Sequence, residues 1–502
     1  MKRNKKVVRI IAIVLAVLLA GGVIVGALFS AFAMAEEAPK RDRQTITMEY
    51  LETEQALRIE QRLVYSNRTS DTLDRLLFYA APNMLRRESA LMYEPDDLES
   101  VFYAGYAPGG MELREVTVDG SPADYGFQGE EELYLRVACA IEPGECAEFV
   151  FRYYLLLTRC GAFVGVGETD VRLGAFYFIP AIYDGEHQEF MPTKPLSFTR
   201  WLHCDAADYE VRLSLQDDVP FEVACTGRVE RERGNSGLDV WHMEAQNARE
   251  FAMCFGKRYR VTERVTTSGV KVRVLSGRRD ADRVAQSVCN AIERCEDWFG
   301  PFPMEVMSVA ESDYPLGTLN YPGLTMVSGV LMDDSRMLNQ KLCFCVAQQY
   351  FGLSAYVAPS ADAWLSDSVS QYIAYLLMEA EEGHDAFQRA INRDWVNDLQ
   401  LTIPGGLNVT SDASRFNARE YAVIVLTRGA VVLHELRQAM GLEPMLEGLA
   451  NFYRLGQDGR TLTEMDFVHC MNEVDGGDWE DFLTDWVFNV DDYVNQSIDW
   501  LS

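Results

Sequence analysis

Alternating apolar and polar positions run through much of the chain between residues 41 and 262. Residues 209–215 (YEVRLSL) follow this period-two pattern without a break, and shorter stretches at 113–118 and 133–137 follow it too. Asp119-Gly120 lies directly after one such stretch and supplies a turn signal. Because short alternating strands separated by turns are typical of antiparallel sheets, the pattern predicts an antiparallel β-sandwich or saddle domain over residues 41–262.

The period changes after one more strand at 270–275. Residues 282–299 place apolar side chains on one helical stripe, and Gly300-Pro301 ends that run. Further helices are predicted at 337–353, 364–382, 419–440, 444–453 and 479–487. The chain is therefore expected to be a multidomain α+β protein whose second domain, residues 263–502, is mainly helical.

The N-terminus has the composition of a membrane anchor. Residues 1–9 carry five Lys and Arg side chains, and residues 10–35 contain no charged residue. An apolar helix of that length rises roughly 39 Å, enough to cross a hydrocarbon core of roughly 30 Å. We expect an uncleaved signal anchor with a cytoplasmic basic tail, which places the main domains outside the cell membrane. A cleaved signal peptide, ending at Ala33-Met34-Ala35, is the alternative.

Charge and cysteine usage narrow the partners. The net charge of −30 makes nucleic acid or an anionic lipid surface an unsuitable partner. Eleven cysteines lack the regular spacing of a disulfide framework, and their odd number leaves one thiol unpaired within the chain. Cys139 and Cys146 flank a turn at Pro143-Gly144, where a disulfide across a hairpin and two unbonded thiols both remain open.

Three segments together carry a family resemblance. They are 317–324 (GTLNYPGL), 344–352 (FCVAQQYFG) and 364–372 (WLSDSVSQY). Their order and spacing resemble the membrane alanyl aminopeptidase family of zinc gluzincins, in particular its small bacterial membrane-anchored members, over nearly the whole region after residue 40. This resemblance implies a thermolysin-like second domain. It also implies a GAMEN-like loop for the substrate's amine, an HExxH helix with two zinc ligands and the general base, and a Glu ligand eighteen residues further on.

The zinc and catalytic positions of this frame are replaced. In the register of the resemblance, the metal ligands fall on Phe344, Gln348 and Asp367, and the general base falls on Cys345. Phe344 has no donor atom, and an amide such as Gln348 is a poor zinc ligand. Asp367 alone keeps an ionisable oxygen, so we expect no bound metal and no other cofactor.

Two further roles are also lost. The resemblance places the oxyanion-stabilising Tyr at Leu426, within 426–430 (LTRGA), and Leu has no donor. The amine-binding Glu is replaced by Asn320, which makes no charge-paired contact. The remaining loop is a weak candidate for substrate binding, and its residues are Gly317, Thr318, Leu319 and Asn320.

Other residues that could carry chemistry are each weighed against a structural role. Cys345 could be a thiol nucleophile, helped by Asp367 or a distant His, or a buried filler. We favour the filler because Lys341 is the only local cation that could lower the pKa of this thiol. His434-Glu435 begins like HExxH but lacks the second His, so a structural histidine is expected. Glu311 and Asp313 are expected to be solvated in a loop.

The retained frame and the lost chemistry together predict a pseudoenzyme. We expect a membrane-anchored aminopeptidase-like protein, catalytically inactive, that binds a peptide or protein partner outside the membrane. An active metallo-aminopeptidase or thiol-dependent hydrolase with an atypical site is the alternative. A purely structural envelope protein is a third possibility.

Overall fold

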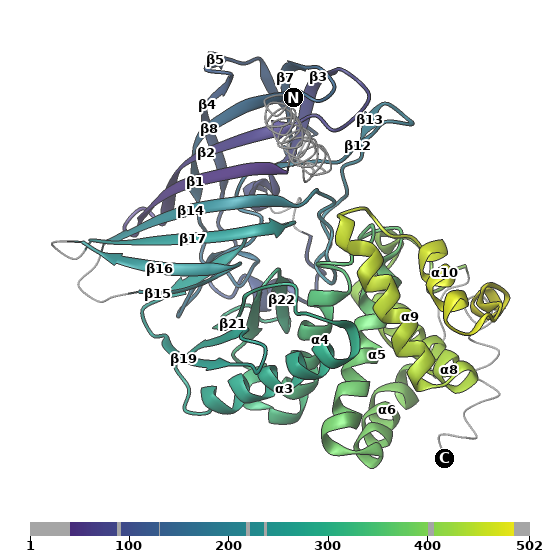
Figure 1. The fold of residues 1–502 in the computed structure, drawn as a ribbon. Coiled ribbons are helices and arrows are strands. Elements are labelled where there is room, and N and C mark those ends of the chain that lie inside the picture. Colours follow the sequence, from purple (N-terminus) through teal and green to yellow (C-terminus); the bar gives the residue numbers. More distant parts are fainter. Residues whose placement is uncertain are drawn as a thin grey trace, which may run out of the picture. The chain divides into compact units, whose positions relative to one another are not determined.

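The computed structural model describes residues 41–87, 92–129, 131–216, 221–234, 238–399 and 406–485 (Figure 1). From Asp42 onward they pack as one compact unit. Within this described part of the chain, no helix is both long and apolar enough to cross a membrane. The anchor predicted at residues 10–35 lies outside the described residues.

The first half is built around one large sheet of eight strands in the order β16-β17-β14-β1-β2-β8-β4-β5. Its strands are β1 (Asp42–Leu51), β2 (Ala56–Ser66), β4 (Gly110–Val118), β5 (Ser121–Pro122), β8 (Cys146–Leu156), β14 (Ala207–Gln216), β16 (Arg228–Arg233) and β17 (Leu238–Ala248). Alternate side chains of β14 are buried, as the period-two pattern predicts. The prediction of a purely antiparallel sheet is wrong at one place, because β1 pairs with β14 in parallel from Asp42 opposite Ala207 onward.

Two smaller sheets of four strands complete this half. One has the order β15-β18-β10-β9 and the other β11-β3-β7-β6, and β12 and β13 form a separate pair. Their strands are β3 (Leu73–Tyr79), β6 (Tyr125–Gln128), β7 (Tyr134–Ile141), β9 (Val164–Val166), β10 (Val171–Leu173), β11 (Ile179–Pro180), β12 (Tyr183–Asp184), β13 (Glu189–Phe190), β15 (Glu222–Cys225) and β18 (Met253–Gly256). Two short helices, η1 (Ala81–Arg86) and α2 (Leu98–Val101), accompany them.

The two predicted turns have different outcomes. Asp119-Gly120 joins β4 to β5 as a tight hairpin, with positive φ at both residues. The turn at Pro143-Gly144 does not make a hairpin, because it carries the chain from β7 in one sheet to β8 in another. Cys139 and Cys146 are both free thiols, as are the other nine cysteines.

The second half opens with a five-stranded sheet of order β19-β20-β21-β23-β22. Its strands are β19 (Arg260–Val265), β20 (Lys271–Ser276), β21 (Val306–Ser312), β22 (Thr318–Tyr321) and β23 (Leu324–Ser328). The predicted boundary after residue 262 falls inside β19, and the division into domains stays a prediction. β22 and β23 form the hairpin that carries the GTLNYPGL segment. Its turn needs Gly323, because φ is 66° there and a Cβ would lie 2.7 Å from the Val306 carbonyl oxygen.

One helix, α3, lies between β20 and β21 in the chain, the others follow the sheet, and they pack together beside it in Figure 1. They are α3 (Ala281–Phe299), α4 (Ser335–Tyr350), α5 (Ala363–Glu382), α6 (His384–Leu399), α7 (Ala418–Tyr421), α8 (Gly429–Met440), α9 (Leu442–Leu455) and α10 (Glu464–Asp475). Short 3-10 helices are η3 (Leu331–Asp333), η4 (Ala413–Arg415) and η6 (Gly456–Asp458). The helix predicted at 419–440 is one helical run from α7 to α8 with a π-helical segment, η5 (Ala422–Arg428), in its middle. The prediction omitted α6 and α10.

Hydrogen bonds tie the β half to the helical half. The buried Arg249 guanidinium donates to the Cys204 carbonyl and, through Nη2, to the Gly459 carbonyl at 2.9 Å. Its plane lies 3.7 Å from the Tyr356 ring centroid. The segment 196–202 of the β half reaches the ends of α4 and α5 by similar contacts, and this is where the candidate site lies.

Candidate functional site

α4 and α5 bring the two polar ligand positions of the peptidase frame together. Gln348 on α4 donates from Nε2 to Asp367 Oδ1 on α5 at 2.8 Å. Both side chains are buried, with exposed fractions of 6% and 5%. The two positions that the resemblance assigns to metal ligands on these helices therefore lie next to each other. A direct hydrogen bond between the Gln348 amide and the Asp367 carboxylate joins the two positions.

Asp367 has donors on every side. Its Oδ2 accepts from Thr199 Oγ1 at 2.9 Å and from the Tyr421 hydroxyl at 2.7 Å, and its Oδ1 also accepts from Ser366 Oγ at 3.2 Å. Gln348, Thr199 and Tyr421 thus donate to this carboxylate, while the single Ser366 proton is divided between Asp367 and the Phe351 carbonyl, also at 3.2 Å. Burial first, and the neighbouring Asp367 charge second, raise the pKa of Tyr421 well above its usual range, so this hydroxyl remains a donor. Both oxygens of Asp367 are therefore engaged by donors of the protein itself.

Asn320 on β22 is bound just as completely. Its Nδ2 donates to Gln348 Oε1 at 2.7 Å and to the Cys345 carbonyl at 3.2 Å. Its Oδ1 accepts from Thr325 Oγ1 and, at 3.3 Å, from Gln349 Nε2. All four hydrogen-bonding capacities of this amide are used inside the protein. Asn320, at the loop position that the resemblance assigns to the substrate's amine, is thus joined to Gln348 and Asp367 in one continuous network.

Phe344 and Cys345 fill the rest of the former HExxH segment. Cys345 is fully buried, and burial raises the pKa of its thiol, against smaller opposing effects from Thr318, Lys341 and Thr325. A thiol that stays protonated and inaccessible is a poor nucleophile, which favours the filler role over thiol catalysis. The Phe344 ring lies beneath the Lys341 ammonium, 5.3 Å from ring centroid to Nζ.

Leu426 lies in the π-helical segment and is partly buried. The neighbouring Gly429 allows the close approach of this helix to α5, because a Cβ there would lie 2.1 Å from Ser368 Oγ. The packing of these two helices therefore requires a glycine at this position of the LTRGA segment. Tyr421, five residues before Leu426, was not predicted to take part in the site, and neither was Thr199. Their sequence surroundings give no motif.

A cavity of about 220 Å³ lies over these residues. It is lined from the peptidase frame by Gly317, Thr318, Leu319, Asn320, Tyr321, Lys341, Phe344, Gln348, Asp367 and Leu426. From the β half it is lined by Met92, Phe163, Ala175, residues 196–202 and Glu250, and from the loop before β22 by Tyr314 and Leu316. All the predicted site residues except Cys345 therefore line one cleft.

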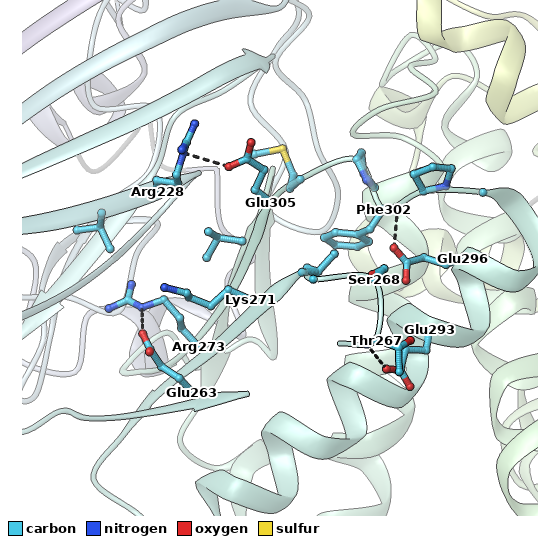
Figure 2. A pocket seen from close by; sticks show the side chains of 18 of the residues that line it. Arg228, Glu263, Thr267, Ser268, Lys271, Arg273, Glu293, Glu296, Phe302 and Glu305 are labelled. Atoms are coloured by element: carbon cyan, nitrogen blue, oxygen red, sulfur yellow. Dashed lines mark hydrogen bonds and ion pairs between the residues drawn. The ribbon is translucent and has the colours of Figure 1, made fainter. Parts of the chain in front are cut away.

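A larger hollow of about 1220 Å³ lies elsewhere, between β16, β20, the end of α3 and the 301–306 loop (Figure 2). Its charged side chains are mostly bound to the protein itself. Arg228 pairs with Glu305 and Arg273 with Glu263, each at 3.1 Å, and Glu293 accepts from the Thr267 amide at 2.7 Å. It contains no residue of the peptidase frame, so we place the candidate site at the smaller cavity.

The residues present do not fit zinc. Phe344 offers no donor atom, the Gln348 amide is engaged on both sides, and Asp367 is surrounded by donors. Across the part of the chain that the structure describes, no group of three or more His, Cys, Asp or Glu side chains is arranged to hold a metal ion.

The competing candidates are structural. His434 is buried, with Nδ1 3.0 Å from the Tyr372 hydroxyl and Nε2 3.2 Å from Gln438 Nε2. Glu311 lies on β21 and binds Ser276 Oγ at 2.6 Å and the Arg278 guanidinium at 2.7 Å. Asp313 accepts from the Thr169 amide at 2.6 Å. The expectation that Glu311 and Asp313 are merely solvated in a loop is wrong.

Comparison with known proteins gives one sequence relative. The chain is 26% identical over 243 residues to aminopeptidase N of Lactococcus lactis subsp. lactis. The match covers 45% of this chain and 28% of the relative, so the matched part spans just over a quarter of that protein. No family model matches the chain.

Solved structures give a fuller match. An M1 zinc metallopeptidase from Deinococcus radiodurans superposes with a TM-score of 0.62 at 18% identity, over 89% of this chain and 93% of that one. A mutant of that enzyme bound to a Tyr-Ser-Ala substrate superposes with a TM-score of 0.61 at 19% identity over the same shares. A two-domain M1 zinc metallopeptidase mutant bound to L-tryptophan reaches 0.63 at 18% identity, over 90% and 95%.

These matches confirm the resemblance to the membrane alanyl aminopeptidase family. They also confirm a multidomain α+β fold with an N-terminal β half and a helical C-terminal half. At these identities the structural match speaks for the fold alone.

Proposed function

We propose that this chain is a catalytically inactive aminopeptidase-like protein whose inherited cleft binds a peptide or a protein partner. The observation that carries the proposal is the hydrogen bond from Gln348 to Asp367, with the network around it. It joins two positions that would hold zinc in the family and leaves neither of them free to do so.

The loss of a base and of an oxyanion donor supports the same proposal. Cys345 is buried and keeps its proton, and Leu426 presents only carbon to the cavity. Activating a water and stabilising a tetrahedral intermediate each need a group that neither side chain has. Hydrolysis would need both functions restored in addition to the metal.

The size of the cavity supports a ligand of about one residue. At about 220 Å³ it lies below the roughly 300–1,000 Å³ of sites for drug-sized molecules. The related M1 metallopeptidases were solved with a tripeptide substrate or with single amino acids bound. By analogy, we propose that the cleft receives one end of a peptide.

We also propose that the protein is held at the cell membrane by residues 10–35, with its folded part outside. The support is the charge-free segment and the five basic residues before it. Extraction from membranes by detergent, and resistance to extraction at alkaline pH, are expected. Release at alkaline pH would favour the cleaved signal peptide.

The proposal of inactivity is tested by turnover. The full-length protein, purified in detergent, is incubated with aminoacyl reporter substrates with and without added zinc. We expect hydrolysis no faster than the buffer blank. Turnover that disappears in Asp367→Ala or Cys345→Ala would overturn the proposal and establish the alternative of an atypical hydrolase.

A further inference from the structure

The cleft has four charged side chains, and their partners decide what it can attract. Arg200, Glu250, Lys341 and Asp367 line the cavity. Both carboxylates are already engaged: Asp367 by the donors described above, and Glu250 by Arg200 Nη2 at 3.3 Å. Burial raises the pKa of Glu250, which weakens it further as a negative group. No carboxylate in the cavity is left free to pair with a ligand amine.

The two cations, Arg200 and Lys341, have hydrogen-bonding or ion-pairing capacity that the described protein groups do not use. Arg200 donates to the Gly352 carbonyl and to Glu250, yet its buried Nε–H has no hydrogen-bond partner among the described residues. Lys341 makes no ion pair with any carboxylate that the structure describes. Since a buried or half-buried charge without a partner is unfavourable, an anionic ligand would gain a favourable contact in this cleft.

Lys341 is also held in place. It lies on α4 one turn before Cys345, and its ammonium is 5.3 Å from the centroid of the Phe344 ring. That distance is within the range of a cation–π contact. Phe344 stands at the first ligand position of the family's metal site, so the residue that removed a zinc ligand now supports a fixed positive charge.

Apolar side chains form part of the wall around this charge, beside the polar Thr318, Asn320 and Gln348. Phe198, Leu319, Phe344 and Leu426 line the cavity beside Lys341. A ligand that combines a carboxylate with an apolar side chain would match both features.

We propose that the cleft recognises an apolar residue through its carboxylate, with Lys341 as the counter-charge, and not through a free amino group. The ligand class is the C-terminal residue of a peptide or an N-acylated amino acid, which share this chemistry. The inference rests on the proposed function, because it assumes that the cleft binds ligand. It reverses the polarity of recognition expected for an aminopeptidase frame, in which a loop Glu holds the substrate's amine.

Two probes of similar size test the polarity. N-acetyl-L-leucine carries a carboxylate and no amine, and L-leucinamide carries an amine and no carboxylate. Titration calorimetry with the full-length protein is expected to show N-acetyl-L-leucine binding at least roughly tenfold more tightly. Acetyl-Gly-Gly-L-leucine serves as the peptide arm. If this peptide binds as tightly as N-acetyl-L-leucine, the ligand is a peptide C-terminus. If it binds more weakly, the ligand is an N-acylated amino acid.

Variants assign the charge. Lys341→Met should weaken N-acetyl-L-leucine binding by roughly tenfold or more, and Lys341→Arg should largely keep it. Lys271→Met, which removes a lysine of the larger hollow described above, is the matched control and should bind N-acetyl-L-leucine like the wild type.

The outcomes separate this inference from the proposed function. Preference for L-leucinamide, or unchanged binding by Lys341→Met, overturns the inference and leaves an inactive binding cleft in place. If neither probe binds, the inference fails and the cleft loses its support as a ligand site. Hydrolysis of L-leucinamide overturns the proposed function itself.

Discussion

Gln348 Nε2 lies 2.8 Å from Asp367 Oδ1, so a hydrogen bond connects α4 to α5 at the place where the family's frame puts zinc. This bond gives both buried side chains a partner within the protein. Buried polar groups such as these must find partners, because an unsatisfied group in a protein interior costs roughly 1–3 kcal/mol.

The first prediction concerns stability. Gln348→Leu removes a donor from buried Asp367 and an acceptor from Asn320, and should lower the free energy of unfolding by roughly 1–3 kcal/mol. Urea denaturation of the full-length protein in detergent measures it. Gln286→Leu, on the exposed face of α3, is the control and should change stability by less than roughly 0.5 kcal/mol. Equal free energies of unfolding for the two variants would show that the network does not stabilise the fold.

The second prediction rebuilds the metal site. The triple variant Phe344→His, Gln348→His, Asp367→Glu restores the family's ligands on a backbone that keeps their spacing, so it should retain about one zinc ion per chain after dialysis. None of the three single variants should do so. The triple variant should still fail to hydrolyse aminoacyl reporters, because Cys345 and Leu426 remain. Turnover by this variant would contradict the account of the lost base and oxyanion donor.

The third prediction concerns thiols. Cys146 is the exposed cysteine and Cys345 is fully buried. Ellman's reagent should therefore titrate Cys146 rapidly in the folded protein and Cys345 only after denaturation. Cys146→Ala should abolish the fast phase, and Cys345→Ala should leave it unchanged. A fast phase of thiol titration that is absent from Cys345→Ala would support the alternative of a thiol-dependent hydrolase.

The fourth prediction follows from buried His434. Burial, mainly, lowers its pKa from 6.5 to about 4, so the unfolded chain binds a proton more readily than the folded one. Its contribution to stability is present above pH 6.5 and is lost as pH falls toward 4, by roughly 2 kcal/mol at pH 5.

A comparison of variants separates the contribution of His434 from those of other groups that titrate in the same pH range. His203 shifts the same way, to about 4, whereas the pKa of Asp42 is raised by burial to about 6 and acts in the opposite direction. Urea unfolding of His434→Asn at pH 7 and pH 5 should show a smaller loss of stability between the two than the wild type. His469→Asn, at an exposed site, should match the wild type. Parallel losses in all three proteins would exclude His434 as the source.

Much of this fold followed from local pattern. The alternation at 209–215 became β14, the apolar stripe at 282–299 became α3, and Asp119-Gly120 became a hairpin turn. Each depends on residues close in sequence, where side-chain period and backbone preference act directly. α6 has the same kind of stripe, with Phe387, Ile391 and Trp395 buried, and the prediction omitted it.

The rest depends on contacts between distant segments. Nothing local in β1 requires a parallel partner 165 residues later, and nothing at Pro143-Gly144 shows that the chain changes sheets there. Likewise, the motif identified Asn320, Gln348 and Asp367 one by one, but their joining into a network needed three separate elements to meet. Thr199 and Tyr421 belong to no motif and were found only through their hydrogen bonds to Asp367.

Zinc content tests the central claim most directly. The full-length protein is purified without chelators, dialysed against buffer containing zinc and then against metal-free buffer, and its zinc per chain is measured by elemental analysis beside an aminopeptidase assay. We predict well under one zinc per chain and no turnover, because Gln348 and Asp367 bind each other and Phe344 offers no ligand. Near-stoichiometric zinc together with aminopeptidase activity would contradict the account.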